Sequence, residues 1–94
     1  MLFLVHMIVQ IPLDADAALV TRLKADEKAM SQKLQQEGRW RHLWRVAGQY
    51  ANYSVIDVES NDALHNLLTA LPLYPYMAIT VTPLAQHPSA IAQN

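Results

Sequence analysis

The sequence contains no cysteine among its 94 residues. This excludes disulfides, thiolate catalysis and cysteine-ligated metal, and it is compatible with the reducing cytoplasm, where we expect the protein to be located. The four histidines, His6, His42, His65 and His87, show no close ligand spacing. Because neighbouring metal ligands normally recur at short intervals, we expect no metal site.

The chain also lacks an excess of positive charge. Seven Lys and Arg residues stand against eight Asp and Glu residues, which gives a formal net charge of -1. Binding to phosphate backbones draws its affinity from many cations that release counterions. We therefore expect no nucleic-acid partner and favour a small molecule or a protein.

No hydrophobic run is long enough to cross a membrane. The N-terminal stretch MLFLVHMIVQIP is interrupted by His6 and Gln10, whereas a membrane helix needs about 20 apolar residues. The stretch also lacks the basic region and the small-residue cleavage site of a signal peptide. Residues 2–11 are apolar at both odd and even positions and end at Pro12, which predicts a buried strand and no membrane partner.

Two helices are predicted from capping residues and apolar periodicity. Asp14 or Asp16 caps a helix that ends near Gly38, and Ser60 or Asn61 caps a second helix that ends before Pro72. One apolar stripe on the first helix comprises Leu19, Val20, Leu23, Met30 and Leu34, and one on the second comprises Ala63, Leu64, Leu67, Leu68 and Leu71.

Three further strands complete the pattern. Residues 39–58 predict two strands joined near Ala47-Gly48-Gln49, and residues 76–84 predict a last strand. The order β-α-β-β-α-β predicts an α+β, ferredoxin-like fold, with a four-stranded antiparallel sheet and two helices on one face. We expect residues 1–94 to form one domain, with residues 84–94 as a C-terminal arm.

The other face of this sheet is expected to be buried in an oligomer. Strands one and four are apolar at both odd and even positions. Such strands are normally covered on both faces, and the helices can cover only one. We therefore expect a homo-oligomer that buries the second face.

One carboxylate interrupts the apolar stripe of the first helix. On a helical wheel of about 100° per residue, Glu27 falls between Val20 and Leu34. A buried carboxylate must be paired or hydrogen-bonded, or its pKa rises. Glu27 is thus a candidate general base, and the alternatives are an edge position or an ion pair with a strand arginine. Lys24 and Ser31 lie one turn away and could hold the carboxylate or bind an anion.

The segment RWRHLWR carries the candidate cations and aromatics. Alternation places Arg39, Arg41 and Arg45 on one face and Trp40, His42 and Trp44 on the other. We expect the tryptophans to pack in the core or an interface. His42 is either a core residue or a neutral donor to a ligand carbonyl.

The following strand contributes polar residues to a face otherwise meant for the core. Asn52 and Ser54 alternate there with Tyr53 and Val55, next to Ile56. Polar groups at such positions indicate either a pocket or a hydrogen-bond network at the edge of the hairpin.

These segments resemble the muconolactone Δ-isomerase family. The resemblance covers nearly the whole chain and is carried most specifically by WRHLWR, YANYS and LPLYPYM. It implies a homodecamer of ferredoxin-like subunits in the catechol branch of the β-ketoadipate pathway. It also implies a reaction without cofactor, in which a lactone carboxylate loses its γ proton and regains it at the α carbon.

The resemblance also suggests three kinds of site residue. The base is Glu27, and the donor to the developing dienolate oxygen is His42, Tyr53 or Asn52. A cation that binds the substrate carboxylate is Lys24, Arg39 or Arg41.

Three other functions fit the same pattern. One is dehalogenation of chloromuconolactones, which begins with the same proton abstraction. The others are a ligand-binding module without catalysis and a cofactor-free monooxygenase on a related barrel.

Overall fold

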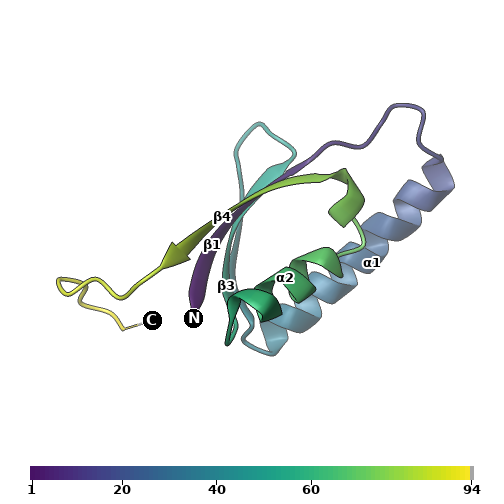
Figure 1. Ribbon diagram of the computed structural model, residues 1–94. Coiled ribbons are helices and arrows are strands. Elements are labelled where there is room, and N and C mark those ends of the chain that lie inside the picture. The colour runs from purple at the N-terminus through teal and green to yellow at the C-terminus, as the bar shows by residue number, and fades with distance from the viewer. Residues whose placement is uncertain (94) are drawn as a thin grey trace.

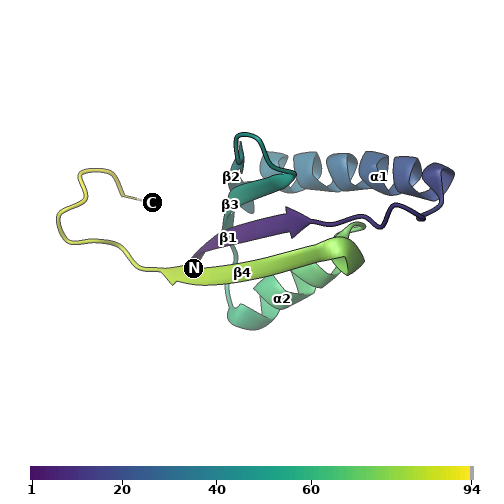
Figure 2. The same cartoon turned by 90° about the horizontal axis from the view of Figure 1, so that it is seen from above.

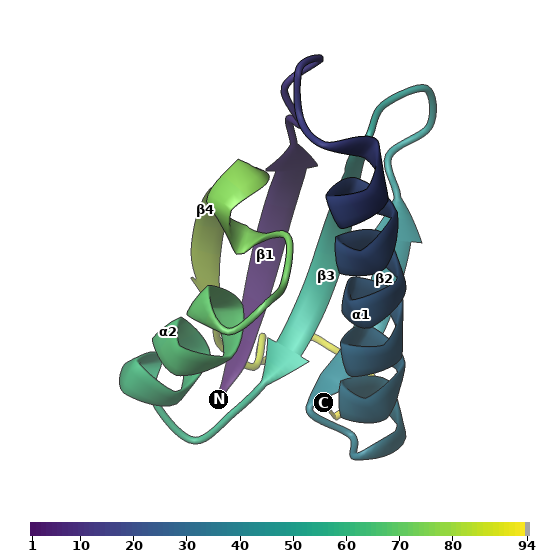
Figure 3. The same cartoon turned by 90° about the vertical axis from the view of Figure 1, so that its right-hand side faces the viewer.

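The computed structural model describes residues 1–93, and its elements follow the predicted order. They are β1 (Leu2–Val9), α1 (Ala17–Gln36), β2 (Trp40–Arg45), β3 (Ala51–Asp57), α2 (Asn61–Thr69), a short 3-10 helix η1 (Tyr74–Tyr76) and β4 (Met77–Leu84). The strands form one antiparallel sheet in the order β2-β3-β1-β4, and both helices cover the same face of it (Figures 1 and 3). The ferredoxin-like α+β fold is confirmed. Neither helix within residues 1–93 has the length and apolar character needed to span a membrane.

The helices begin and end at residues suited to those positions. The carboxylate of Asp16 accepts hydrogen bonds from two backbone N–H groups in the first turn of α1, at 2.9 and 3.4 Å. Ser60 caps α2 in the same way, at 3.0 Å. Gly38 follows α1 with a φ of 78°, a conformation that only glycine adopts at little cost. Asp16 and Ser60 are therefore the caps, in place of Asp14 and Asn61.

The core lies between the sheet and the two helices. Phe3, Val5 and Met7 of β1 point toward the helices and are at most 1% exposed. They pack with Leu34 of α1, Trp40 of β2, Ile56 of β3, Val58 just after β3, Leu64, Leu67 and Leu68 of α2, and Leu71 just after α2. Along α1, only Ser31 and Leu34 are buried. The N-terminal part of this helix therefore stands away from the sheet.

The opposite face of the sheet, which we call the open face, is only partly apolar. Trp44, Tyr53 and Leu84 on this face are 68%, 43% and 41% exposed. Thr80 and Thr82 also lie there, because they pair with β1 residues that point away from the helices. The prediction that the last strand is apolar on both faces was therefore wrong.

A bulge in β2 changes which of its residues share a face. Trp40 pairs with Ile56 and His42 pairs with Val55, so Arg41 is an extra residue in β2. Before the bulge Trp40 faces the helices and is 2% exposed, whereas after it Trp44 faces away and is 68% exposed. The prediction that the two tryptophans share one face was wrong.

The same bulge separates the arginines of β2. Leu43 and Arg45 pair with Ser54 and Asn52, which lie on the helix-facing side of β3. Arg45 thus points toward the helices, and the predicted common face of Arg39, Arg41 and Arg45 does not form. Beyond Leu84, the end of β4, the chain leaves the sheet and extends away from it (Figures 1 and 2).

Candidate active site

A cavity of about 440 Å³ lies between α1, the β2–β3 hairpin and the start of β4. Its volume is within the range of small-molecule sites, roughly 300 to 1,000 Å³. It occupies the space that the N-terminal part of α1 leaves above the sheet. The lining residues are Val9, Lys24, Glu27, Lys28, Ser31, Trp40, Leu43, Arg45, Tyr50, Asn52, Leu73 and Met77.

Glu27 is the acidic residue of this cavity and is half-buried. Its Oε1 accepts a hydrogen bond of 2.9 Å from the backbone N–H of Leu73. Burial raises the pKa of the Glu27 carboxyl from its ordinary value of 4.5, and the bond from Leu73 offsets part of that rise. Within residues 1–93 Glu27 forms no ion pair, so the alternative of a salt bridge to a strand arginine does not hold.

Three cations share the cavity with this carboxylate. Lys24 and Lys28 come from α1, one turn before and one residue after Glu27, and Arg45 comes from the end of β2. Among the ion pairs found in residues 1–93, none includes any of the three. The cavity therefore has a surplus of positive charge and suits an anionic ligand. In the same part of the chain no group of three or more His, Asp or Glu residues is placed to hold a metal ion.

The side chains of Ser31 and Asn52 add hydrogen-bonding groups to the cavity lining. Ser31 is 8% exposed, and its hydroxyl donates to the backbone carbonyl of Lys28 at 3.0 Å. The hydroxyl of Ser54, which is fully buried, donates to Asn52 Oδ1 at 2.8 Å. With Oδ1 engaged in this way, the amide N–H groups of Asn52 are left to donate to a ligand.

Trp40 forms part of the cavity wall and of the core. Its indole N–H is buried without a hydrogen-bond partner in the described part of the chain. Burial of a donor without a hydrogen-bond partner lowers the stability of the fold by about 1–3 kcal/mol. The fold therefore leaves this buried polar group of Trp40 unsatisfied within residues 1–93.

The structure brings together four of the eight predicted site residues. Glu27, Lys24, Ser31 and Asn52 all line the cavity, whereas the other four, Arg39, Arg41, His42 and Tyr53, lie elsewhere in residues 1–93. The bulge at Arg41 turns His42 toward the open face and Arg45 toward the cavity. Tyr53 faces away from the cavity because it alternates with Asn52 along β3.

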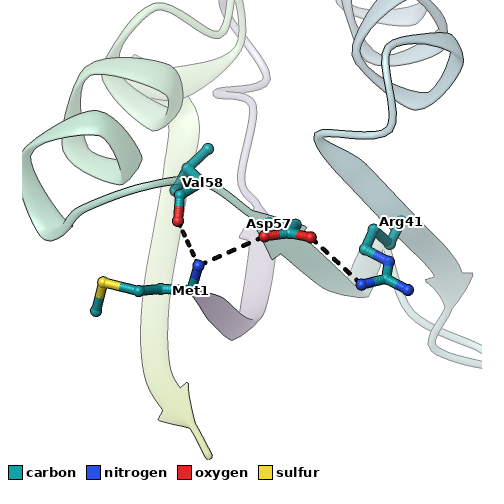
Figure 4. Close-up of polar contacts among 4 residues, drawn as sticks. All are labelled: Met1, Arg41, Asp57 and Val58. Carbon is teal, nitrogen blue, oxygen red and sulfur yellow. Dashed lines mark hydrogen bonds and ion pairs between the residues drawn. The ribbon is translucent and has the colours of Figure 1, made fainter. Parts of the chain in front are cut away.

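Carboxylates already pair with Arg39 and Arg41, the two predicted site arginines that lie outside the cavity. Arg41 Nη1 lies 3.3 Å from Asp57 Oδ2, and the N-terminal ammonium group contacts the other oxygen of Asp57 at 3.5 Å (Figure 4). Arg39 lies 3.9 Å from Glu37 and lines a separate cavity between α1 and α2. On the open face, Tyr53 stacks on His6 with ring centroids 4.5 Å apart.

Sequence reasoning missed Lys28, Arg45 and Tyr50 as lining residues. Lys28 directly follows Glu27, and its long side chain can reach a site that its backbone position does not face. Arg45 was assigned to a face by an alternation that the bulge interrupts. Tyr50 lies in the hairpin connection, for which no face can be assigned from strand periodicity.

The raised pKa of Glu27 means that ionisation of this carboxyl group destabilises the folded state, so stability should depend on pH. Because the folded state binds this proton more tightly, the free energy of unfolding falls as the pH rises through the interval between 4.5 and the raised pKa. Glu27→Gln keeps an acceptor for the Leu73 N–H but cannot ionise. We expect this variant to be more stable than wild type at pH 7, with the difference shrinking below pH 4.5.

Urea denaturation at pH 7 and pH 4 measures this difference. Asp26→Asn, which alters an exposed carboxylate one residue away, is the matched control. If Glu27→Gln lowered the stability equally at both pH values, burial of the charge would not be the dominant influence on Glu27.

Comparisons with known proteins by sequence point to one family. Residues 1–90 match the family model described as muconolactone delta-isomerase. Muconolactone Delta-isomerase 2 of Acinetobacter lwoffii is 63% identical over 91 residues, which cover 97% of this chain and 95% of that protein. Muconolactone Delta-isomerase of Pseudomonas aeruginosa is 58% identical, with the same two coverages.

Solved structures give a consistent result. A crystal structure of muconolactone isomerase superposes with a TM-score of 0.94 at 60% identity, covering 100% of this chain and 98% of that one. A putative antibiotic biosynthesis monooxygenase from Deinococcus radiodurans shares the fold alone, with a TM-score of 0.50 at 13% identity over 98% of this chain and 100% of that one. The chain belongs to the muconolactone delta-isomerase family of isomerases.

Proposed function

We propose that this chain converts muconolactone to 3-oxoadipate enol-lactone by proton transfer, without a cofactor, in the breakdown of catechol. The observation that carries the proposal is a half-buried carboxylate, Glu27, which is the acidic side chain in a cavity that three cations also line. The substrate has a ring carbon that must lose a proton and a carboxylate that must be bound. In the cavity Glu27 can accept the proton, and Lys24, Lys28 and Arg45 can bind the carboxylate.

Glu27 is the base in this proposal. It removes the proton from the ring γ carbon, and the electron pair of that C–H bond moves through the ring onto the lactone carbonyl oxygen. The same carboxyl group then returns the proton to the α carbon, and the double bond ends next to the ring oxygen. A carboxylate with a raised pKa suits both steps, because it holds the proton more readily than an ordinary one.

The carboxymethyl arm of the substrate binds to Lys24 and Arg45. Both line the cavity, and within residues 1–93 neither forms an ion pair. Arg45 can bind a carboxylate through two parallel N–H donors, and Lys24 adds a compact charge. Arg39 and Arg41 are poorer candidates since each already contacts a carboxylate.

Asn52 is the donor for the oxygen that becomes negative. Its Oδ1 accepts from Ser54, so its N–H groups are oriented toward other acceptors. Donors placed at a developing oxyanion contribute about 3–4 kcal/mol each. His42 and Tyr53 lie on the open face of the sheet and would contact a neighbouring subunit in place of a substrate in this cavity.

The proposal includes a homo-oligomer, a decamer as the family resemblance implies. Trp44 and Tyr53 are paired and exposed on the open face, and Leu84 is exposed at its other end. Exposed apolar side chains of this kind commonly mark protein interfaces. A second copy of the chain would bury them. A cytoplasmic location belongs to the same proposal and fits a chain without cysteine.

Replacement of the base is the direct test of the function. With muconolactone as substrate, we expect Glu27→Gln to lower kcat by about 100-fold or more, because the general base is lost. Asp26→Asn should stay within about twofold of wild type, since Asp26 is exposed and outside the cavity. Turnover by Glu27→Gln within about tenfold of wild type, a loss of about 1.4 kcal/mol or less, would show that Glu27 is not the base.

Two arginine variants distinguish the proposed carboxylate ligand from its neighbour on the same strand. Arg45→Met should raise KM about tenfold with little change in kcat, since the carboxylate is bound equally in the ground and transition states. Arg41→Met should leave KM unchanged, because Arg41 contacts Asp57. The reverse result in steady-state kinetics would assign the role to Arg41.

Sedimentation velocity tests the oligomer. We expect the wild-type protein to sediment as a species much larger than the 10.6 kDa chain. Trp44→Lys should release smaller species, because Trp44 is exposed in the single chain and would be buried in the interface. Leu13→Lys changes an exposed apolar residue in the loop before α1 and serves as the control. An unchanged profile for Trp44→Lys would argue against an interface on the open face.

A further inference from the structure

Tyr50 occupies an unusual position between the cations of the cavity. Lys24 Nζ lies 5.4 Å from the centroid of the Tyr50 ring, and Arg45 Cζ lies 5.4 Å from the same centroid. Both distances are within the range of about 6 Å for a cation–π contact. One ring thus contacts a cation from α1 and a cation from the end of β2.

The backbone fixes the place of this ring. The carbonyl of Tyr50 accepts a hydrogen bond of 3.0 Å from the N–H of Val9 at the end of β1. The side chain itself is 44% exposed, so burial in the core does not account for its orientation. The two cation contacts are the interactions that the structure gives to the ring, and all three side chains line the cavity.

An aromatic ring holds cations without neutralising them. A carboxylate at this position would pair with Lys24 or Arg45 and would compete with an anionic ligand. The ring attracts both cations through its quadrupole but carries no net charge. By contrast, Arg39 and Arg41 each contact a carboxylate, which neutralises their charge.

We propose that Tyr50 is a positioning residue that holds Lys24 and Arg45 together as a two-cation receptor for the carboxylate of the ligand. This inference rests on the proposed function for the identity of the ligand, a small lactone with a carboxymethyl arm. It adds that carboxylate recognition depends on a side chain that does not itself contact the carboxylate.

Equilibrium binding tests this receptor separately from catalysis. The probe is the saturated lactone with the same carboxymethyl arm, which lacks the ring double bond, and its methyl ester is the uncharged comparison. By titration calorimetry on the full chain, wild type should bind the acid about tenfold or more tightly than the ester. Tyr50→Phe retains the ring and should keep this preference, whereas Tyr50→Leu and Tyr50→Gln should lose most of it.

Two controls separate positioning from a general structural effect. Tyr74→Leu removes a comparably exposed tyrosine, at 38%, that does not line the cavity, and it should keep the full preference. In the Arg45→Met background, Tyr50→Leu should weaken acid binding less than it does in wild type, because one of its two cations is already gone.

The outcomes also distinguish this inference from the proposed function. A tenfold preference that persists in both Tyr50→Leu and Tyr50→Gln would overturn the positioning role even if muconolactone is turned over normally. Equal binding of acid and ester by wild type would overturn it as well. A preference that depends on the Tyr50 ring would support the receptor even in a protein that fails to turn over muconolactone.

Discussion

The hydrogen bond from the Leu73 N–H to Glu27 is the interaction around which the site is arranged. It joins α1 to the turn before η1, two segments separated by 46 residues in sequence. Without it the half-buried carboxylate would have no hydrogen-bond or ion-pair partner within residues 1–93. Burial raises the pKa of Glu27 and the bond lowers it, so the two opposing influences leave a carboxylate that is held in place and still binds a proton more readily than an exposed one.

The distribution of charge around this carboxylate separates structural cations from those available to a ligand. Arg39 and Arg41 contact carboxylates at the surface, where such pairs contribute little to stability. Lys24 and Arg45 instead contact the ring of Tyr50 and line the cavity. A chain with a net charge of only -1 can therefore present a strongly cationic cavity, and it is this local surplus that fits an anionic lactone.

Features that depend on periodicity within one segment could be predicted from the sequence. The order of the elements, the position of Glu27 in an apolar stripe and the inward orientation of Asn52 and Ser54 are of this kind. Features that depend on pairing between segments could not. The bulge at Arg41 arises from the register of β2 against β3. Because of it, Arg45 lines the cavity, whereas Arg39 and Arg41, the predicted arginines, do not. The partner of Glu27 was equally inaccessible, because a backbone N–H has no signature in the sequence.

A direct titration of Glu27 tests the central claim that the fold tunes this carboxylate for proton transfer. Carbon-13 NMR of protein labelled at glutamate carboxyl carbons, with Glu27→Gln used to assign the resonance, gives the pKa of this group alone. We predict a midpoint above the ordinary value of 4.5. A midpoint at or below 4.5 would mean that the hydrogen bond from Leu73 and the nearby cations outweigh burial, and it would contradict a role for Glu27 as a base tuned by its surroundings.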